Sequence, residues 1–149
     1  MRSSRLLFLM LTLAMGAAAC DEKLATIAGP TPDLEPTFAS LQANIFELTD
    51  SAGRNACISC HTNVGRTPAG GLNLQHDAAY DQLVNVNSTE VPSLKRVTPG
   101  NPDASYIVHK IEGSAGIVGL RMPRTGPPYM TDGQILILRR WIELGAPRN

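Results

Sequence analysis

Five consecutive residues, Cys57-Ile58-Ser59-Cys60-His61, place two thiols and an imidazole at a spacing that suits covalent cofactor binding. The pattern C-x-x-C-H is the attachment sequence for a c-type haem. Two thiols three positions apart on one helical turn can each add to one vinyl group on the same porphyrin edge. The following histidine offers a ring nitrogen to the iron. The pattern therefore predicts one covalent haem c, held by Cys57 and Cys60, with His61 as its proximal ligand.

Three other interpretations of these residues stay open on the motif alone. A thioredoxin-like dithiol requires a βαβ pattern around the two cysteines, and the sequence does not indicate one. A zinc site requires four ligands, whereas the chain has three cysteines, of which the third is distant. A disulfide between Cys57 and Cys60 would close a very small, strained loop. Features elsewhere in the sequence are needed to distinguish these interpretations from a haem site.

The segment 1–19 has the pattern of a bacterial export signal. Arg2 and Arg5 precede an apolar run, residues 6–15, and small residues follow at 16–19. This run is too short for a membrane-spanning helix and has the wrong flanking residues. We therefore expect residues 1–19 to be a signal peptide of the lipoprotein type.

Cys20 directly follows three alanines and resembles the lipidated first residue of a bacterial lipoprotein. Ala17 occupies the position where such signals usually carry leucine, and the same alanines would also suit an ordinary signal peptidase. We favour lipidation because an unpaired thiol at an exported N-terminus otherwise has no explanation. All three cysteines then have a role, and export agrees with haem attachment, which in bacteria takes place outside the cytoplasmic membrane.

The composition of the mature chain suits one small domain with a bound cofactor. Only 5% of the residues are aromatic, and a porphyrin would supply the missing apolar area. Residues 20–94 contain three basic and nine acidic residues, whereas residues 95–149 contain eight and four. This asymmetry is either a simple solvated surface or a basic rim that orients acidic redox partners. The composition does not indicate nucleic-acid binding.

Apolar spacing and turn residues predict the elements around the motif. Residues 20–35 are a polar tether, and the domain spans residues 36–149. We expect helices over residues 36–49, near 76–84, over 102–112 and from Thr131 or Asp132 to Gly145. In the last of these, the predicted apolar face consists of Ile135, Leu136, Leu138, Trp141, Ile142 and Leu144.

The loop Leu120-Arg121-Met122-Pro123 carries the second candidate ligand. A methionine thioether is a soft ligand that suits haem iron on the side opposite histidine. Met122 is our choice, and Met130 is its main rival. His109 and His76 are weaker alternatives that would give bis-histidine ligation. Each of these residues could instead be ordinary core or surface.

Taken in order, the features resemble a class I-like cytochrome c domain over residues 36–147. The resemblance is carried by the C-x-x-C-H motif, by Val97-Thr98-Pro99-Gly100-Asn101-Pro102, by the R-M-P loop and by Trp141-Ile142-Glu143-Leu144-Gly145-Ala146. It implies an all-α fold of four to five helices wrapped around one haem, with Met122 as distal ligand. It also implies that the N- and C-terminal helices cross, for which we predict contact between Phe46 and Trp141.

The same resemblance implies that a backbone carbonyl after the motif accepts the other N–H of His61, and Pro68 is our candidate for that segment. Leu72 and Leu74 are expected to touch the porphyrin or the core.

We therefore expect a periplasmic, lipid-anchored monohaem cytochrome that transfers single electrons between redox protein partners, acts as a monomer and is not an enzyme. A haem-binding sensor or accessory subunit with weakly ligated iron is the alternative function.

Overall fold

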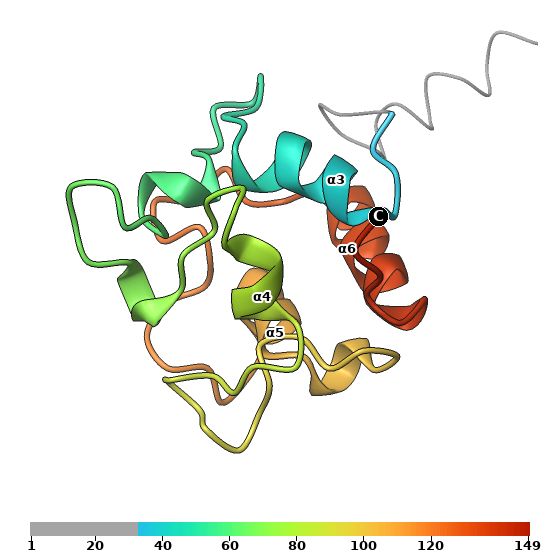
Figure 1. The fold of residues 1–149 in the computed structure, drawn as a ribbon. Helices are drawn as coiled ribbons and strands as arrows, with labels where there is room; N and C mark the ends of the chain where they lie inside the picture. The colour runs from blue at the N-terminus through green and yellow to red at the C-terminus, as the bar shows by residue number, and fades with distance from the viewer. Residues whose placement is uncertain (1–32) are drawn as a thin grey trace, which may run out of the picture.

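The computed structural model describes residues 33–149, so the predicted signal peptide, Cys20 and most of the tether lie outside the described residues. The described part is helical and contains no strand, only isolated β-bridges such as the one between Val84 and Val97. This agrees with the predicted all-α class. Four α-helices of this part, α3, α4, α5 and α6, are labelled in Figure 1.

The first helical segment is shorter than predicted. Helix α3 (Phe38–Leu41) has Thr37 as its N-cap, whose side-chain oxygen accepts the N–H of Ser40. It continues as the π-helical segment η1 (Gln42–Phe46). The predicted helix extended to residue 49. The helical segment ends at Phe46, and the Asp50 carboxylate accepts the backbone N–H groups of Ala52 and Arg54 in the turn that follows.

The middle of the chain forms two short α-helices. Helix α4 (Ala79–Leu83) begins slightly later than the predicted start near residue 76. The helix predicted over 102–112 is divided into the 3₁₀ turn η4 (Pro102–Ala104) and helix α5 (Tyr106–Glu112). The division occurs at Ser105 because the N–H groups of Tyr106 and Ile107 bond to the carbonyls of Lys95 and Arg96.

Helix α6 (Asp132–Glu143) is the best predicted element. Thr131 is its N-cap and forms a capping box with Gln134. The prediction for its apolar face was too broad, since Leu136 and Leu144 are 62% and 52% exposed. The apolar residues that the helix buries are Ile135, Leu138, Trp141 and Ile142, whose spacing of three, three and one positions keeps them on one helix face.

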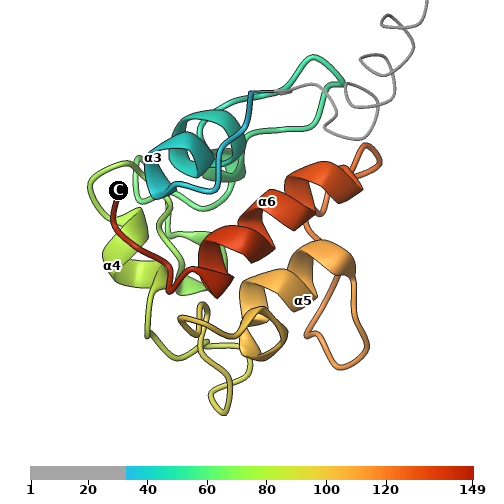
Figure 2. The ribbon, with the colours of Figure 1, turned by 90° about the vertical axis from the view of Figure 1, so that its right-hand side faces the viewer.

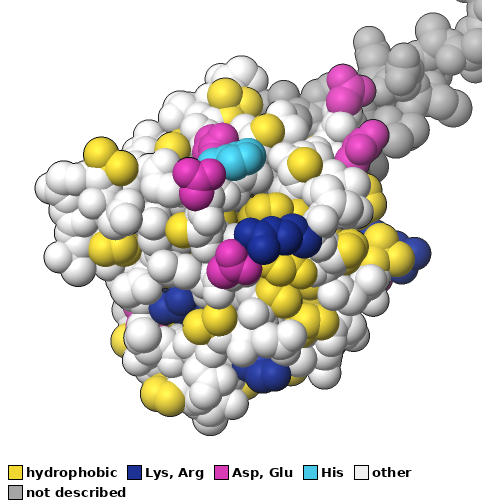
Figure 3. Space-filling model, viewed as in Figure 1, with side chains coloured by type: hydrophobic (Ala, Val, Ile, Leu, Met, Phe, Trp, Pro, Cys, Tyr) yellow, Lys and Arg dark blue, Asp and Glu magenta, His cyan; other side chains and the backbone are white. Residues whose placement is uncertain are grey.

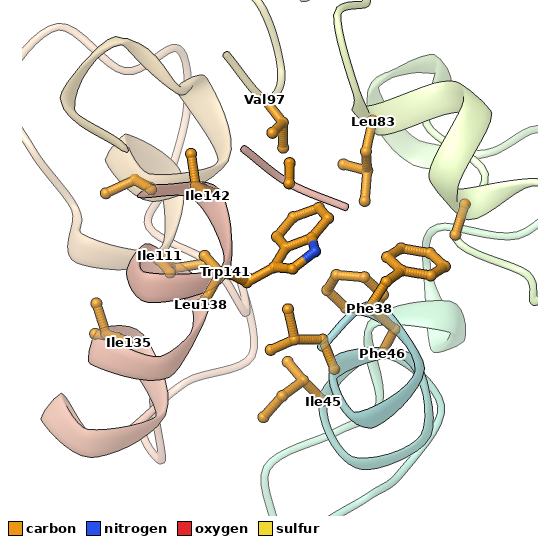
Figure 4. Close-up of a cluster of buried hydrophobic side chains, with 14 of the residues drawn as sticks. Phe38, Ile45, Phe46, Leu83, Val97, Ile111, Ile135, Leu138, Trp141 and Ile142 are labelled. Atoms are coloured by element: carbon orange, nitrogen blue, oxygen red, sulfur yellow. The ribbon is translucent and has the colours of Figure 1, made fainter. Parts of the chain in front are cut away.

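Helix α6 lies between α3 and α5 (Figure 2). Its Trp141 is fully buried at the centre of the hydrophobic core, beside α3 (Figure 4). The ring paired with Trp141 is Phe38, at 5.7 Å between centroids, and Phe46 packs against Phe38 at 6.5 Å. Phe38 is thus the ring that pairs with Trp141 between the two terminal segments, and the predicted residue, Phe46, lies in the same buried core cluster.

The C-terminal residues close this packing. The N–H groups of Phe38 and Ala39 donate to the side-chain and main-chain oxygens of Asn149, and the Tyr80 hydroxyl donates to the Ala146 carbonyl at 2.9 Å. These bonds tie the chain end to α3 and α4. On the face seen in Figure 3, charged side chains of both signs are scattered between hydrophobic and neutral ones.

Among residues 33–149, no helix combines the length and the apolar character that crossing a membrane requires.

Candidate functional site

A cavity of about 440 Å³ brings together Cys57, Cys60, His61 and Met122. Its volume lies within the range of pockets that hold small molecules and cofactors. Most of its wall is apolar, and α5 and α6 contribute to it as well as the segments around the motif. The apolar lining includes Ile45, Phe46, Leu72, Leu74, Leu83, Ile107, Ile111, Met130 and Leu138.

The C-x-x-C-H motif forms a single turn. Residues Cys57–Ser59 are a 3₁₀ helix (η2), and the Cys57 carbonyl accepts the N–H groups of Cys60 and His61 at 3.2 and 2.9 Å. Both cysteines are free thiols, so the structure does not contain the disulfide that the motif left open. Burial raises the pKa of the Cys57 thiol, an effect that the neighbouring Arg54 guanidinium opposes. The turn thus presents two thiols and an imidazole to one cavity.

The imidazole of His61 is fixed by a backbone carbonyl. Its Nδ1 lies 2.9 Å from the carbonyl oxygen of Ala69. The predicted partner segment is therefore confirmed, but Pro68 was the wrong residue, because its own carbonyl accepts the N–H of Gly71 in the turn η3 (Ala69–Gly71). With Nδ1 engaged, Nε2 is the nitrogen available to a metal.

Burial also lowers the pKa of His61, which favours the neutral imidazole. Neutral imidazole is the form that ligates metals. The geometry and the electrostatics of this side chain therefore suit the role of an iron ligand.

The segment that holds His61 is itself held by residues distant in the sequence. The Thr89 hydroxyl donates to the Gly70 carbonyl at 2.7 Å, and the Arg96 guanidinium donates to the Gly71 carbonyl at 3.0 Å. Sequence reasoning missed both anchors. Nothing in the local pattern of residues 88–96 indicates them, because each contact joins two segments that are far apart in the chain.

Arg54 is a third residue at the site that the sequence did not indicate. It is almost fully buried, forms an ion pair with the equally buried Asp50 at 3.0 Å and donates to the carbonyls of Ile45 and Asn55. The Cys57 thiol donates to the same Ile45 carbonyl at 3.4 Å. The i, i+4 spacing of Asp50 and Arg54 directly before the motif was the signal that could have revealed this pair. The Asp50–Arg54 pair therefore supports residues 54–61, which we call the attachment turn.

Both candidate methionines line the cavity, in different ways. Met130 is 6% exposed and belongs to the hydrophobic core. Met122 is partly exposed and ends a loop, residues 113–122, which we call the strap. The two histidine rivals do not line the cavity: His76 lies 3.4 Å from Glu47 at the surface, and His109 bonds to the carbonyl of Asp103. Of the four predicted candidates, the two methionines line the cavity and the two histidines do not.

Leu72 and Leu74 take the places expected of them, since both line the cavity and Leu74 is buried in the core. Among the described residues, no group of three or more His, Cys, Asp or Glu side chains could hold a metal ion. A zinc site of the usual four-ligand kind thus has no ligand set in residues 33–149.

Comparison with known proteins gives no relative: no family model matches the chain, and neither curated proteins nor solved structures yield a match.

Proposed function

We propose that the chain is a c-type cytochrome with one haem, bound in the cavity through thioether bonds to Cys57 and Cys60. One observation carries this proposal. A single apolar cavity is lined by both thiols, by His61 and by Met122, although Met122 is distant from the C-x-x-C-H motif in the sequence. The proposed fold is a small cytochrome c fold whose helices enclose this haem.

The other side chains of the cavity support a haem rather than a purely apolar ligand. Its lining contains five cationic residues and one carboxylate, Glu90. Haem combines a large apolar ring, which the aliphatic wall would cover, with two propionate groups, which need positive charge or water. The five cationic residues of the lining are Arg54, Arg66, Arg96, Lys110 and Arg124.

In the proposed site, each protein group has a defined task. When bound, the haem supplies an iron that gains and loses one electron. His61 offers Nε2 to the iron, while the Ala69 carbonyl fixes the plane of the imidazole. Met122, which lines the same cavity, would offer its thioether as the second ligand, and a soft sulfur ligand favours the ferrous state. The apolar side chains exclude water, so that the redox potential is expected to be fairly high.

The proposed location follows from the sequence of the segment 1–20. Export across the cytoplasmic membrane and a lipid on Cys20 would place the domain in the periplasm, tethered to a bacterial membrane. There it would exchange single electrons with redox protein partners. The tether of residues 20–35 would let the monomeric domain reach them.

The experiment that tests this proposal is expression of the full chain with its export signal in a host that has the haem-maturation machinery. The intact mass is expected to increase by one haem, and the reduced protein is expected to keep its c-type absorption bands after acid extraction. The double variant Cys57→Ala/Cys60→Ala is expected to lose the covalent haem completely. A wild-type protein without covalent haem would overturn the proposal.

Carbon monoxide separates the proposed carrier from a haem sensor. If Met122 occupies the sixth position, the reduced protein as isolated is expected to bind carbon monoxide weakly. Rapid and tight binding would instead identify an open or weakly ligated iron, as the alternative function requires.

A further inference from the structure

The strap has little apolar packing of its own. Leu120 is 61% exposed and Val118 is 48% exposed, and residues 115, 116 and 119 are exposed as well. A loop without buried side chains gains little from the hydrophobic effect and opens easily unless polar contacts hold it. The contacts that fix the strap therefore decide where Met122 lies.

Almost all these contacts come from α5. The N–H of Met122 donates to the Lys110 carbonyl at 2.8 Å, and the Arg121 side chain donates to the Ile111 carbonyl at 2.7 Å. In the middle of the strap, Val118 is held on both sides of its backbone. Its N–H donates to the Tyr106 hydroxyl at 3.0 Å, and its carbonyl accepts from Lys110 Nζ at 2.7 Å.

A carboxylate on a third segment connects the two α5 side chains. Glu90 Oε2 accepts the Tyr106 hydroxyl at 2.8 Å and lies 3.3 Å from Lys110 Nζ. The tyrosine therefore donates to Glu90 and accepts from Val118, while the ammonium group serves both Glu90 and Val118. Charge-assisted bonds in a shared network are stronger than isolated neutral ones.

Lys110 is the residue on which these contacts converge. It is 8% exposed, which is unusual for a lysine. It lines the cavity, and it fixes the strap at two points, through its ammonium group at Val118 and through its carbonyl at Met122. A buried cation lowers the stability of a protein unless it is well paired. The ammonium group of Lys110 has two partners, the Glu90 carboxylate and the Val118 carbonyl of the strap.

We propose that Lys110, with Glu90 and Tyr106, is a positioning group that holds the strap and thereby keeps Met122 at the cavity. The consequence of this arrangement is control of access to the sixth position of the iron, and this part rests on the proposed function. Its structural part, that the network fixes the strap, holds with or without haem.

The test compares full-chain wild-type protein with Lys110→Met, which keeps an apolar stem but removes the ammonium group. Hydrogen–deuterium exchange followed by mass spectrometry is expected to show about tenfold or greater loss of protection in peptides covering residues 113–122, the effect of losing a charge-assisted bond. Peptides from α6 are expected to keep wild-type protection. The matched control, Lys95→Met, removes a lysine that does not line the cavity and is expected to change nothing in the strap.

Tyr106→Phe provides a second variant if Lys110→Met fails to fold, because it removes a single oxygen atom. Protection of the same peptides is expected to fall, by a smaller factor. Unchanged protection of residues 113–122 in both variants would overturn the proposal. So would an equal loss of protection in α6, since Lys110 would then be a general stabilising residue.

Imidazole binding to the haem-loaded variants measures the consequence at the iron. If the network positions Met122, imidazole is expected to bind about tenfold more tightly to Lys110→Met than to wild type and to Lys95→Met. Unchanged imidazole affinity together with a loosened strap would overturn the control of Met122. Absence of covalent haem from the wild type would instead refute the proposed function and leave the exchange experiment valid.

Discussion

The attachment turn, residues 54–61, and the strap, residues 113–122, line the same cavity but are held in opposite ways. The attachment turn is supported by a buried ion pair, Asp50 with Arg54, and follows the helical segment that packs against Trp141. The strap is exposed along most of its length and depends on hydrogen bonds to α5.

This difference separates a rigid side of the proposed site from an adjustable one. Covalent attachment and the proximal ligand need a fixed geometry, and the buried Asp50–Arg54 pair and the Ala69 carbonyl supply it. A methionine that leaves or returns needs a smaller barrier, and a loop held by a few polar bonds supplies that. The two sides are therefore expected to respond differently to substitution.

The largest expected effect is on the attachment side. Arg54→Met removes one partner of a buried pair and leaves the Asp50 carboxylate uncompensated, which typically costs about 3–5 kcal/mol of stability. Urea unfolding followed by circular dichroism measures this cost. The control Arg66→Met removes an exposed cation from the same cavity rim and is expected to cost less than about 1 kcal/mol. Equal costs would show that the buried pair does not support the turn.

The two methionines are expected to differ in stability. Met130→Ala leaves a void in the hydrophobic core and is expected to cost about 2–5 kcal/mol. In the protein without haem, Met122→Ala truncates a partly exposed side chain and is expected to cost about 1 kcal/mol or less. Thermal unfolding of the pair in parallel checks the order. A larger loss of stability in Met122→Ala would show that the strap, and not the hydrophobic core, contributes more to the stability of the cavity wall.

The smallest expected effect sharpens the comparison on the proximal side. Thr89→Val keeps the shape of the side chain but removes its bond to the Gly70 carbonyl, next to the carbonyl that holds His61. A loss of about 0.5–1.5 kcal/mol is expected, as for a typical hydrogen bond. Urea unfolding gives the size, and Thr125→Val is a comparison on the other rim, where the Thr125 hydroxyl accepts from Asn55 at 3.3 Å. No loss in Thr89→Val would mean that the loop holds the Ala69 carbonyl without help.

Local sequence signals predicted the elements whose stabilising contacts are local. Thr131 and Gln134 are three positions apart, and their capping box is visible in the sequence alone. The C-x-x-C-H turn is likewise closed by bonds within the motif itself.

The features that the sequence did not reveal depend on contacts between distant segments. The ring pair of Phe38 with Trp141 joins the first and the last helix of the described chain, and no local pattern indicates which phenylalanine forms it. Ala69 replaces Pro68 beside His61 because the turn η3 occupies the proline carbonyl. The role of Lys110 could not be predicted at all, since its partner Glu90 lies on a much earlier segment of the chain.

The visible absorption spectrum of the oxidised, haem-loaded protein, recorded for wild type, Met122→Ala and Met130→Ala, shows which methionine is bound to the iron. A weak far-red band indicates methionine sulfur on ferric haem. If Met122 is the distal ligand, this band is present in wild type and in Met130→Ala and is lost in Met122→Ala. A band that survives in Met122→Ala and disappears in Met130→Ala would contradict this assignment, because the distal ligand would then come from the core and not from the strap.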